Sequence, residues 1–73
     1  MKKITGKVQF INLEMGFWGI VGENGKEWHP VNMPNQLKYE GKQVTVKAMV
    51  LPGDVSFVMW GTPIKIVSFS TIG

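Results

Sequence analysis

The chain has 73 residues, no cysteine and a formal net charge of +3, so we expect one domain without disulfides or thiolate metal sites. A domain of this size has a thin core, which must be built largely from its hydrophobic residues, 44% of the chain. All eight basic residues are lysines, and Lys is a point charge, unsuited to bidentate reading of guanine. The charge therefore indicates either simple solubility or an anionic partner bound with little regard to sequence.

The N-terminal segment MKKITGKVQF has basic residues but no apolar run after them, which is not typical of a secretory signal. The sequence also has no apolar stretch of about 18 residues that could span a bilayer. We therefore expect a cytoplasmic protein with no membrane partner.

The first expected element is a strand over residues 2–11, which alternates between apolar and polar residues. Ile4, Val8 and Phe10 share one of its faces. The segment 12–16, with sequence NLEMG, has the composition of a turn that ends this strand.

A second strand is expected over residues 17–21, weakened or bulged at Gly19. The Asn24-Gly25 pair that follows is the strongest short signal for a type I′ hairpin turn. It predicts a returning strand over residues 26–31. Pro30 has no N–H to donate, so it marks an edge or the end of that strand.

The second half begins with residues 32–41, which contain two helix breakers and predict a loop with one helical turn at 35–39. Residues 42–51 form the clearest alternating strand of the chain. Their even-numbered apolar positions are expected on one face, and the segment 52–54 turns the chain after them.

Two further β segments are expected at 55–60 and 64–69, with either a bend or a break at residues 61–63. Five or six short strands with hairpin connections would expose open sheet edges unless the sheet closes. The sequence therefore predicts an all-β domain over residues 1–73. The expected form is a small five-stranded OB-type barrel, closed or partly open, with an SH3-like barrel or an open meander as alternatives.

The stretch 6–20, GKVQFINLEMGFWGI, resembles the start of bacterial cold-shock domains, whose usual pattern is GKVKWFNAEKGFGFI. The resemblance implies an OB-type barrel that binds single-stranded nucleic acid on aromatic strands. It places Lys7 at a basic position and Phe10 and Phe17 at aromatic ones. The matching positions are Gly6, Lys7, Val8, Asn12, Glu14, Gly16, Phe17 and Ile20.

Departures from that pattern fall at the binding positions. Met15 stands where the family has Lys, and Gly19 stands where it has its second stacking Phe. Trp18 replaces a Gly and by alternation faces away from Phe17. His29 is similar to the histidine of the family's third strand. The chain also resembles small prokaryotic β-barrel proteins without an assigned activity, in GFWGIVGENGK, LKYEGKQV and MWGTPIKI.

Aromatic side chains on adjacent strands can stack on bases, at about 1–3 kcal/mol per base, while lysines contact phosphates. The candidate residues for such a surface are Phe10, Phe17, Trp28 and His29 for stacking, and Lys7 and Lys26 for phosphates, with Lys47 as a further candidate. The alternative for Phe10 and Phe17 is a place in the core, and Trp18 and Trp60 are interpreted as core or rim residues.

Catalysis is not expected, and no cofactor is expected either. His29 is the single histidine, whereas a zinc site needs three or four ligands. No serine or threonine has a local signature that pairs it with a base. The sequence therefore favours a non-catalytic module that binds single-stranded RNA or DNA with low specificity.

The alternative function is a protein-interaction or structural barrel that binds a protein partner or self-associates. Met49 falls on the polar side of its predicted strand, near Leu51. If both are exposed, they form an apolar patch suited to a partner.

Overall fold

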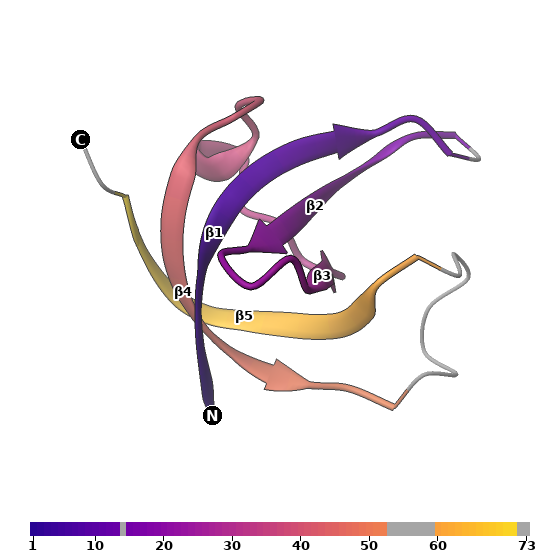
Figure 1. The fold of residues 1–73 in the computed structure, drawn as a ribbon. Helices are drawn as coiled ribbons and strands as arrows, with labels where there is room; N and C mark the ends of the chain where they lie inside the picture. The colour runs from indigo at the N-terminus through magenta and orange to yellow at the C-terminus, as the bar shows by residue number, and fades with distance from the viewer. Residues whose placement is uncertain (14, 53–59, 72–73) are drawn as a thin grey trace.

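The chain forms a closed barrel of five strands in the order β1-β2-β3-β5-β4 (Figure 1). The computed structural model describes residues 1–13, 15–52 and 60–71. Its elements are β1 (Lys2–Ile11), β2 (Phe17–Gly22), β3 (Glu27–Pro30), the 3-10 helix η1 (Asn35–Leu37), β4 (Gln43–Val50) and β5 (Thr62–Thr71). This architecture confirms the predicted all-β fold, a small barrel of the OB- or SH3-like class, and excludes the open meander.

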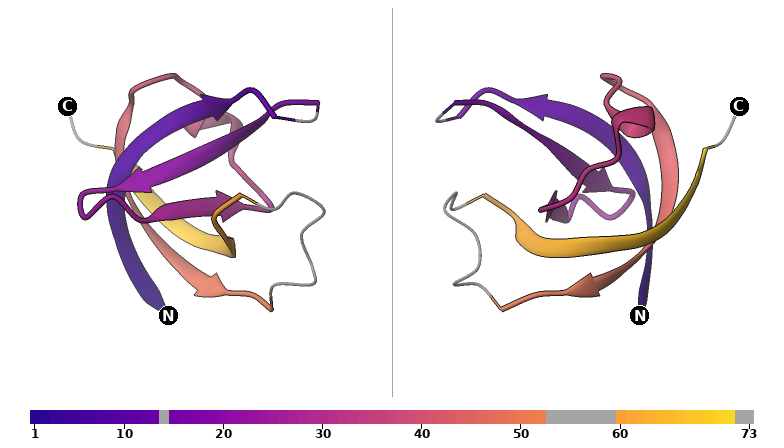
Figure 2. Two further views of the ribbon diagram at one scale, coloured as in Figure 1. Left: turned by 45° about the vertical axis from the view of Figure 1, so that its right-hand side comes forward. Right: turned by 180° about the vertical axis from the view of Figure 1, so that it is seen from behind.

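Strand β1 belongs to both sides of the barrel, as the two further views in Figure 2 show. Its first part, Lys2 to Lys7, pairs with β4, and its second part, Gly6 to Ile11, pairs with β2. Gly6 lies where the two pairings overlap, and a Cβ there would collide with the carbonyl oxygen of Val21. Glycine at this position therefore lets β1 approach β2 closely while it crosses from one side to the other.

The hairpin between β2 and β3 is confirmed, but the predicted two-residue type I′ turn is wrong. The N–H of Gly25 donates to the carbonyl of Gly22 at 2.9 Å, so the turn spans residues 22–25. Gly25, the last residue of this turn, has φ of 83°, in the left-handed region. The side chain of Asn24 accepts a hydrogen bond from the N–H of Lys26 at 3.0 Å. Asn24 thus supports the turn through its side chain.

Strand β5 closes the barrel by pairing in parallel with β3 and antiparallel with β4. A β-bulge interrupts the β4–β5 ladder between Lys47 and Ala48, which pair with Ser68 and Ile66. The bulge expected at Gly19 is absent, because the β1–β2 register runs without a break through the Gln9–Gly19 pair. The bulge of the β4–β5 ladder has its extra residue on β5. This residue is Val67, because its neighbours Ile66 and Ser68 pair with the adjacent residues Ala48 and Lys47.

The core is made by the inward residues of all five strands, closed at one end by Leu37 of η1. Val50 and Phe10 share the inward alternation of β4 and β1 but are 53% and 44% exposed. Both lie near strand ends, beyond the enclosed part of the barrel. The buried core residues are Ile4, Val8, Ile20, Trp28, Leu37, Val44, Val46, Ala48, Ile64 and Ile66.

In the second half of the chain, the described helical turn and strands lie where the sequence predicts them. The predicted helical turn is η1, which starts at Asn35, and the predicted strand at 42–51 is β4. The strand expected at 64–69 is the longer β5. The strand expected at 55–60 lies mostly outside the described residues. Within the described part of the chain, no helix has the length and apolar character needed to cross a bilayer.

Candidate nucleic-acid interface

Three aromatic side chains gather on the outer face of β2 and β3. Phe17 and His29 alternate with the inward residues of these strands, and their ring centroids lie 4.4 Å apart at an interplanar angle of 35°. The ring of Trp60 meets Phe17 edge-on, with centroids 5.6 Å apart. We call this cluster of Phe17, His29 and Trp60 the aromatic surface. All three side chains are partly exposed.

Trp60 reaches this surface because Gly19 has no side chain. Gly19 is an outward position of β2, two residues from Phe17. A Cβ on Gly19 would lie 2.6 Å from Cη2 of Trp60, well inside van der Waals contact. The six-membered ring of the indole therefore rests on the backbone of β2, in the place where a strand side chain would stand.

A groove of about 500 Å³ adjoins the aromatic surface at the end of the barrel near the β1–β2 turn. Phe17 and His29 line it together with Phe10, Trp18 and Lys38. The rings of Phe10 and Trp18 meet edge-on at 5.2 Å, and these residues are cross-strand partners. Trp18 is partly buried against the core, as the rim interpretation predicted, whereas Phe10 is exposed at the groove.

His29 is held near neutrality by its surroundings. Partial burial lowers the pKa of its imidazole below the ordinary 6.5, because removing water disfavours the charged form. At neutral pH the ring is therefore mainly uncharged. An uncharged imidazole in contact with Phe17 presents a flat ring face that suits stacking better than ion pairing.

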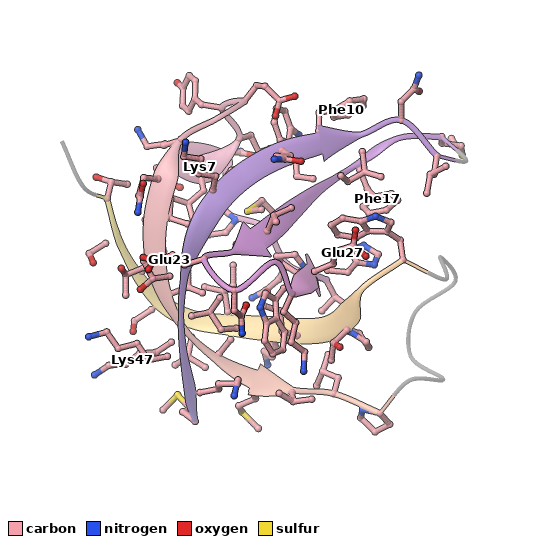
Figure 3. The ribbon with its side chains drawn as sticks, in the orientation of Figure 1. Lys7, Phe10, Phe17, Glu23, Glu27 and Lys47 are labelled. Atoms are coloured by element: carbon pink, nitrogen blue, oxygen red, sulfur yellow. The ribbon has the colours of Figure 1, made fainter. Side chains whose placement is uncertain are left out.

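The lysines do not encircle the aromatic surface. Figure 3 shows Phe10 and Phe17 toward the β1–β2 turn, while Lys7 and Lys47 lie on the opposite side of the view. Lys7 faces outward on β1 as the partner of Val21, four register positions from the Ile11–Phe17 pair. Of these candidates, Lys7 is the one that lies on the same pair of strands as Phe17.

Two of the predicted binding residues are engaged elsewhere. Trp28, expected to stack on bases, is only 4% exposed and belongs to the core. It points inward because it alternates with His29 on β3, so its ring face is not open to a ligand. Lys26, expected to contact phosphate, holds its Nζ 4.7 Å from the centroid of the Trp28 ring. That contact is a cation–π interaction at the edge of the core.

Sequence reasoning missed Trp60 and Lys38. Trp60 was interpreted as a core or rim residue at the end of the strand expected at 55–60, so it was not assigned to a binding surface. The available signal was Gly19 itself, since an outward glycine in an aromatic strand leaves room for a ring from another segment. Lys38 follows η1 in a connection without periodicity.

The arrangement offers aromatic stacking faces beside the ammonium group of Lys38. Among the residues that the structure describes, no group of three or more His, Cys, Asp or Glu side chains could hold a metal ion. Comparisons of this chain with protein-family models, with curated proteins and with solved structures found no match.

Proposed function

We propose that this protein is a non-catalytic module of the OB type that binds single-stranded RNA or DNA with low sequence specificity. The observation that carries the proposal is the aromatic surface, in which Phe17, His29 and Trp60 meet within 5.6 Å on one outer face. Side chains that could have been buried in so small a domain are instead gathered where a ligand can reach them.

Stacking supplies the main binding energy in this proposal. Every base has a π face, so a surface of aromatic rings accepts any base, at about 1–3 kcal/mol each. The partly exposed rings of Phe17 and Trp60 are the primary stacking positions, and the groove beside Phe10 takes a neighbouring base or sugar. The location also supports the proposal, since OB-type barrels bind oligonucleotides on their second and third strands.

Phosphates are contacted by Lys7 on β1 and by Lys38 at the groove. Both carry compact ammonium groups, and the chain has no arginine to read base edges in bidentate fashion. Electrostatic contacts of this kind do not depend on sequence. The cold-shock resemblance of residues 6–20 fits the same proposal, with Trp60 in the place of the stacking residue that Gly19 lacks.

The test is a titration with oligo-dT at low salt, followed by tryptophan emission. We expect quenching at micromolar or higher oligonucleotide concentration. With two to four phosphate contacts, the slope of log K against log salt should be about −1.5 to −3. Trp60→Phe is the matched control, because it keeps a stacking ring but removes one emitter. Unchanged emission of the wild type at high micromolar oligonucleotide would falsify the proposal.

A second candidate function is self-association or binding to a protein partner through β4 and β5. Met49, expected on the exposed side of its strand, is 51% exposed, and Val50 and Val67 are exposed to a similar extent. Leu51 is only partly exposed. Sedimentation at several concentrations tests this function, and a monomer throughout the range counts against self-association.

A further inference from the structure

Lysine and hydroxyl side chains share one outer face of the barrel, on the sheet formed by β1, β4 and β5. Lys3 pairs directly with Lys47, and Lys47 pairs with Ser68 on its other side. The next outward row joins Thr5, Thr45 and Ser70 across the same three strands. We call these six residues the lysine face.

The two lysines of this face are direct cross-strand neighbours, which is unfavourable for like charges. The hollow beside them, about 380 Å³, is lined by Lys3, Thr45, Lys47, Ser68, Phe69 and Ser70, and none of these residues is acidic. Two acidic residues lie beside β1: Glu40 accepts a hydrogen bond from the N–H of Phe10 at 3.0 Å, and Glu23 lines one hollow with Lys3 and Thr5 and another with Lys7. The hollow that Lys3 shares with Lys47 has no carboxylate in its lining, whereas Glu23 lines the hollow that Lys3 shares with Thr5.

The β-bulge is what brings the serines to the lysines. Before the bulge, Lys65 pairs with Met49 on the outer face, so odd-numbered residues of β5 face outward there. After the bulge, Ser68 and Ser70 take the outward positions instead. Without the extra residue, Val67 would stand opposite Lys47. Bulges are frequent where a strand has to redirect side chains beside a functional site.

The lysine face and the aromatic surface are connected along the outer side of β1. Between Lys3 and Ile11, which pairs with Phe17, the outward residues are Thr5, Lys7 and Gln9. At about 3.3 Å per residue, eight residues span about 26 Å along the strand. In Figure 3, Lys7 lies toward the upper left, with Glu23 below it, Lys47 at the lower left and Phe17 on the right.

We propose that the lysine face binds the phosphodiester backbone of a nucleic-acid strand that continues along β1 from the aromatic surface. Ammonium groups and hydroxyl donors in one hollow match phosphate oxygens, which accept hydrogen bonds and carry negative charge. This inference rests on the proposed function for the identity of the strand. The lysine face adds a second contact area for the strand, so the affinity of the protein for an oligonucleotide should increase with the length of the oligonucleotide.

The experiment compares oligo-dT of about 4 and about 12 nucleotides, a range typical of OB-type sites. The wild type should bind the longer strand more tightly and with a steeper salt dependence, by about 1.4 in log–log slope for two lysines. The double variant Lys3→Gln/Lys47→Gln should lose this difference and keep tryptophan quenching by the short strand. The matched control is Lys2→Gln/Lys42→Gln, which removes the same charge and should keep the wild-type difference.

An abasic strand of about 12 nucleotides separates the two proposals, because it carries phosphates without bases. Measured by anisotropy, it should bind the wild type and the control variant, and bind Lys3→Gln/Lys47→Gln more weakly. If the abasic strand binds in this way while oligo-dT of either length leaves tryptophan emission unchanged, the stacking proposal fails and the lysine face stands. If oligo-dT quenches emission but the two double variants bind the long strand equally, the lysine face is overturned and stacking stands.

Discussion

The indole of Trp60 lies on the backbone of Gly19, where a Cβ would approach its Cη2 to within 2.6 Å. These residues are far apart in the sequence, but the absence of a side chain at Gly19 is what makes room for the indole of Trp60. The glycine opens a space on the outer face of β2, and the tryptophan fills it beside Phe17. An aromatic surface is thus built from two strands and a connection rather than from strands alone.

The Gly19–Trp60 contact predicts compensation between substitutions. Gly19→Phe should destabilise the wild type by about 1–3 kcal/mol, because the new ring and the indole compete for one space. In a Trp60→Ala background the same substitution should cost clearly less. Urea unfolding of the two single variants and the double variant measures the interaction as a double-mutant cycle.

Val21→Phe is the control for that cycle, since Val21 is the next outward position of β2. Its cost should be similar with and without Trp60. Equal costs of Gly19→Phe in the two backgrounds would show that the two residues do not compete.

Stacking on the aromatic surface predicts the effect of truncating its rings. Phe17→Ala and Trp60→Ala should each weaken oligo-dT binding by about 1–3 kcal/mol, or roughly 5- to 150-fold. Tyr39→Ala is the matched control, because Tyr39 is a 61% exposed aromatic residue whose ring contacts Lys42. Anisotropy with a labelled oligonucleotide measures all three. An equal loss in the Tyr39 variant would mean that the effect is not specific to the aromatic surface.

Strand positions and the inward faces could be predicted from sequence because alternation is a local property. Ile4, Val8 and Val46 are buried as their period-two pattern requires. The burial of Trp28 was harder to predict, because its polar neighbours in the sequence indicated an exposed strand. The β-hairpin and the pairing of β3 with β5 carry that residue into the core.

Two features of the candidate surfaces could not be predicted, because they depend on contacts between distant segments. The position of Trp60 follows from a vacancy at Gly19 rather than from any motif around Trp60. The outward direction of Ser68 follows from a bulge that shifts the β4–β5 register. Simple alternation carried through from Ile64 would place Ser68 inward, which is the opposite of what the structure has.

The lowered pKa of His29 leads us to expect that the free energy of unfolding depends on pH. Burial lowers its pKa in the folded protein, so the unfolded chain binds a proton more readily. The free energy of unfolding should therefore decrease as the pH falls below about 6.5, the ordinary value, and level off below the folded pKa. Above that range the contribution of His29 should be constant.

Two measurements check this pH dependence. An NMR titration of the imidazole should give a midpoint below 6.5, and urea unfolding at pH 7.5 and 5.5 should show the loss. His29→Gln should reduce the difference between the two pH values. A midpoint above 6.5 would contradict the stated direction, and so would an equal pH effect in the variant.

Asn32, which also lines the groove beside the aromatic surface, should contribute to stability through its hydrogen bonds with β5. Its side-chain oxygen accepts from the N–H of Ile66 at 2.8 Å, and its Nδ2 donates to the carbonyl of Ile66 at 3.0 Å. The side chain thus pairs with β5 as a strand residue would, just beyond the end of β3 at Pro30. Asn32→Ala should lower the free energy of unfolding by about 1–3 kcal/mol, since two hydrogen bonds are lost.

Asn32→Asp tests the geometry of this pair more sharply. At neutral pH a carboxylate can accept from the N–H of Ile66 but cannot donate to its carbonyl, so we expect a loss of about 1 kcal/mol or more. Asn35→Ala is the matched control, because Asn35 is an exposed asparagine at the start of η1. Urea unfolding compares the three variants at one pH. Stabilities of the Asn32 variants equal to that of the Asn35 variant would show that the pairing with Ile66 does not hold the end of the barrel closed.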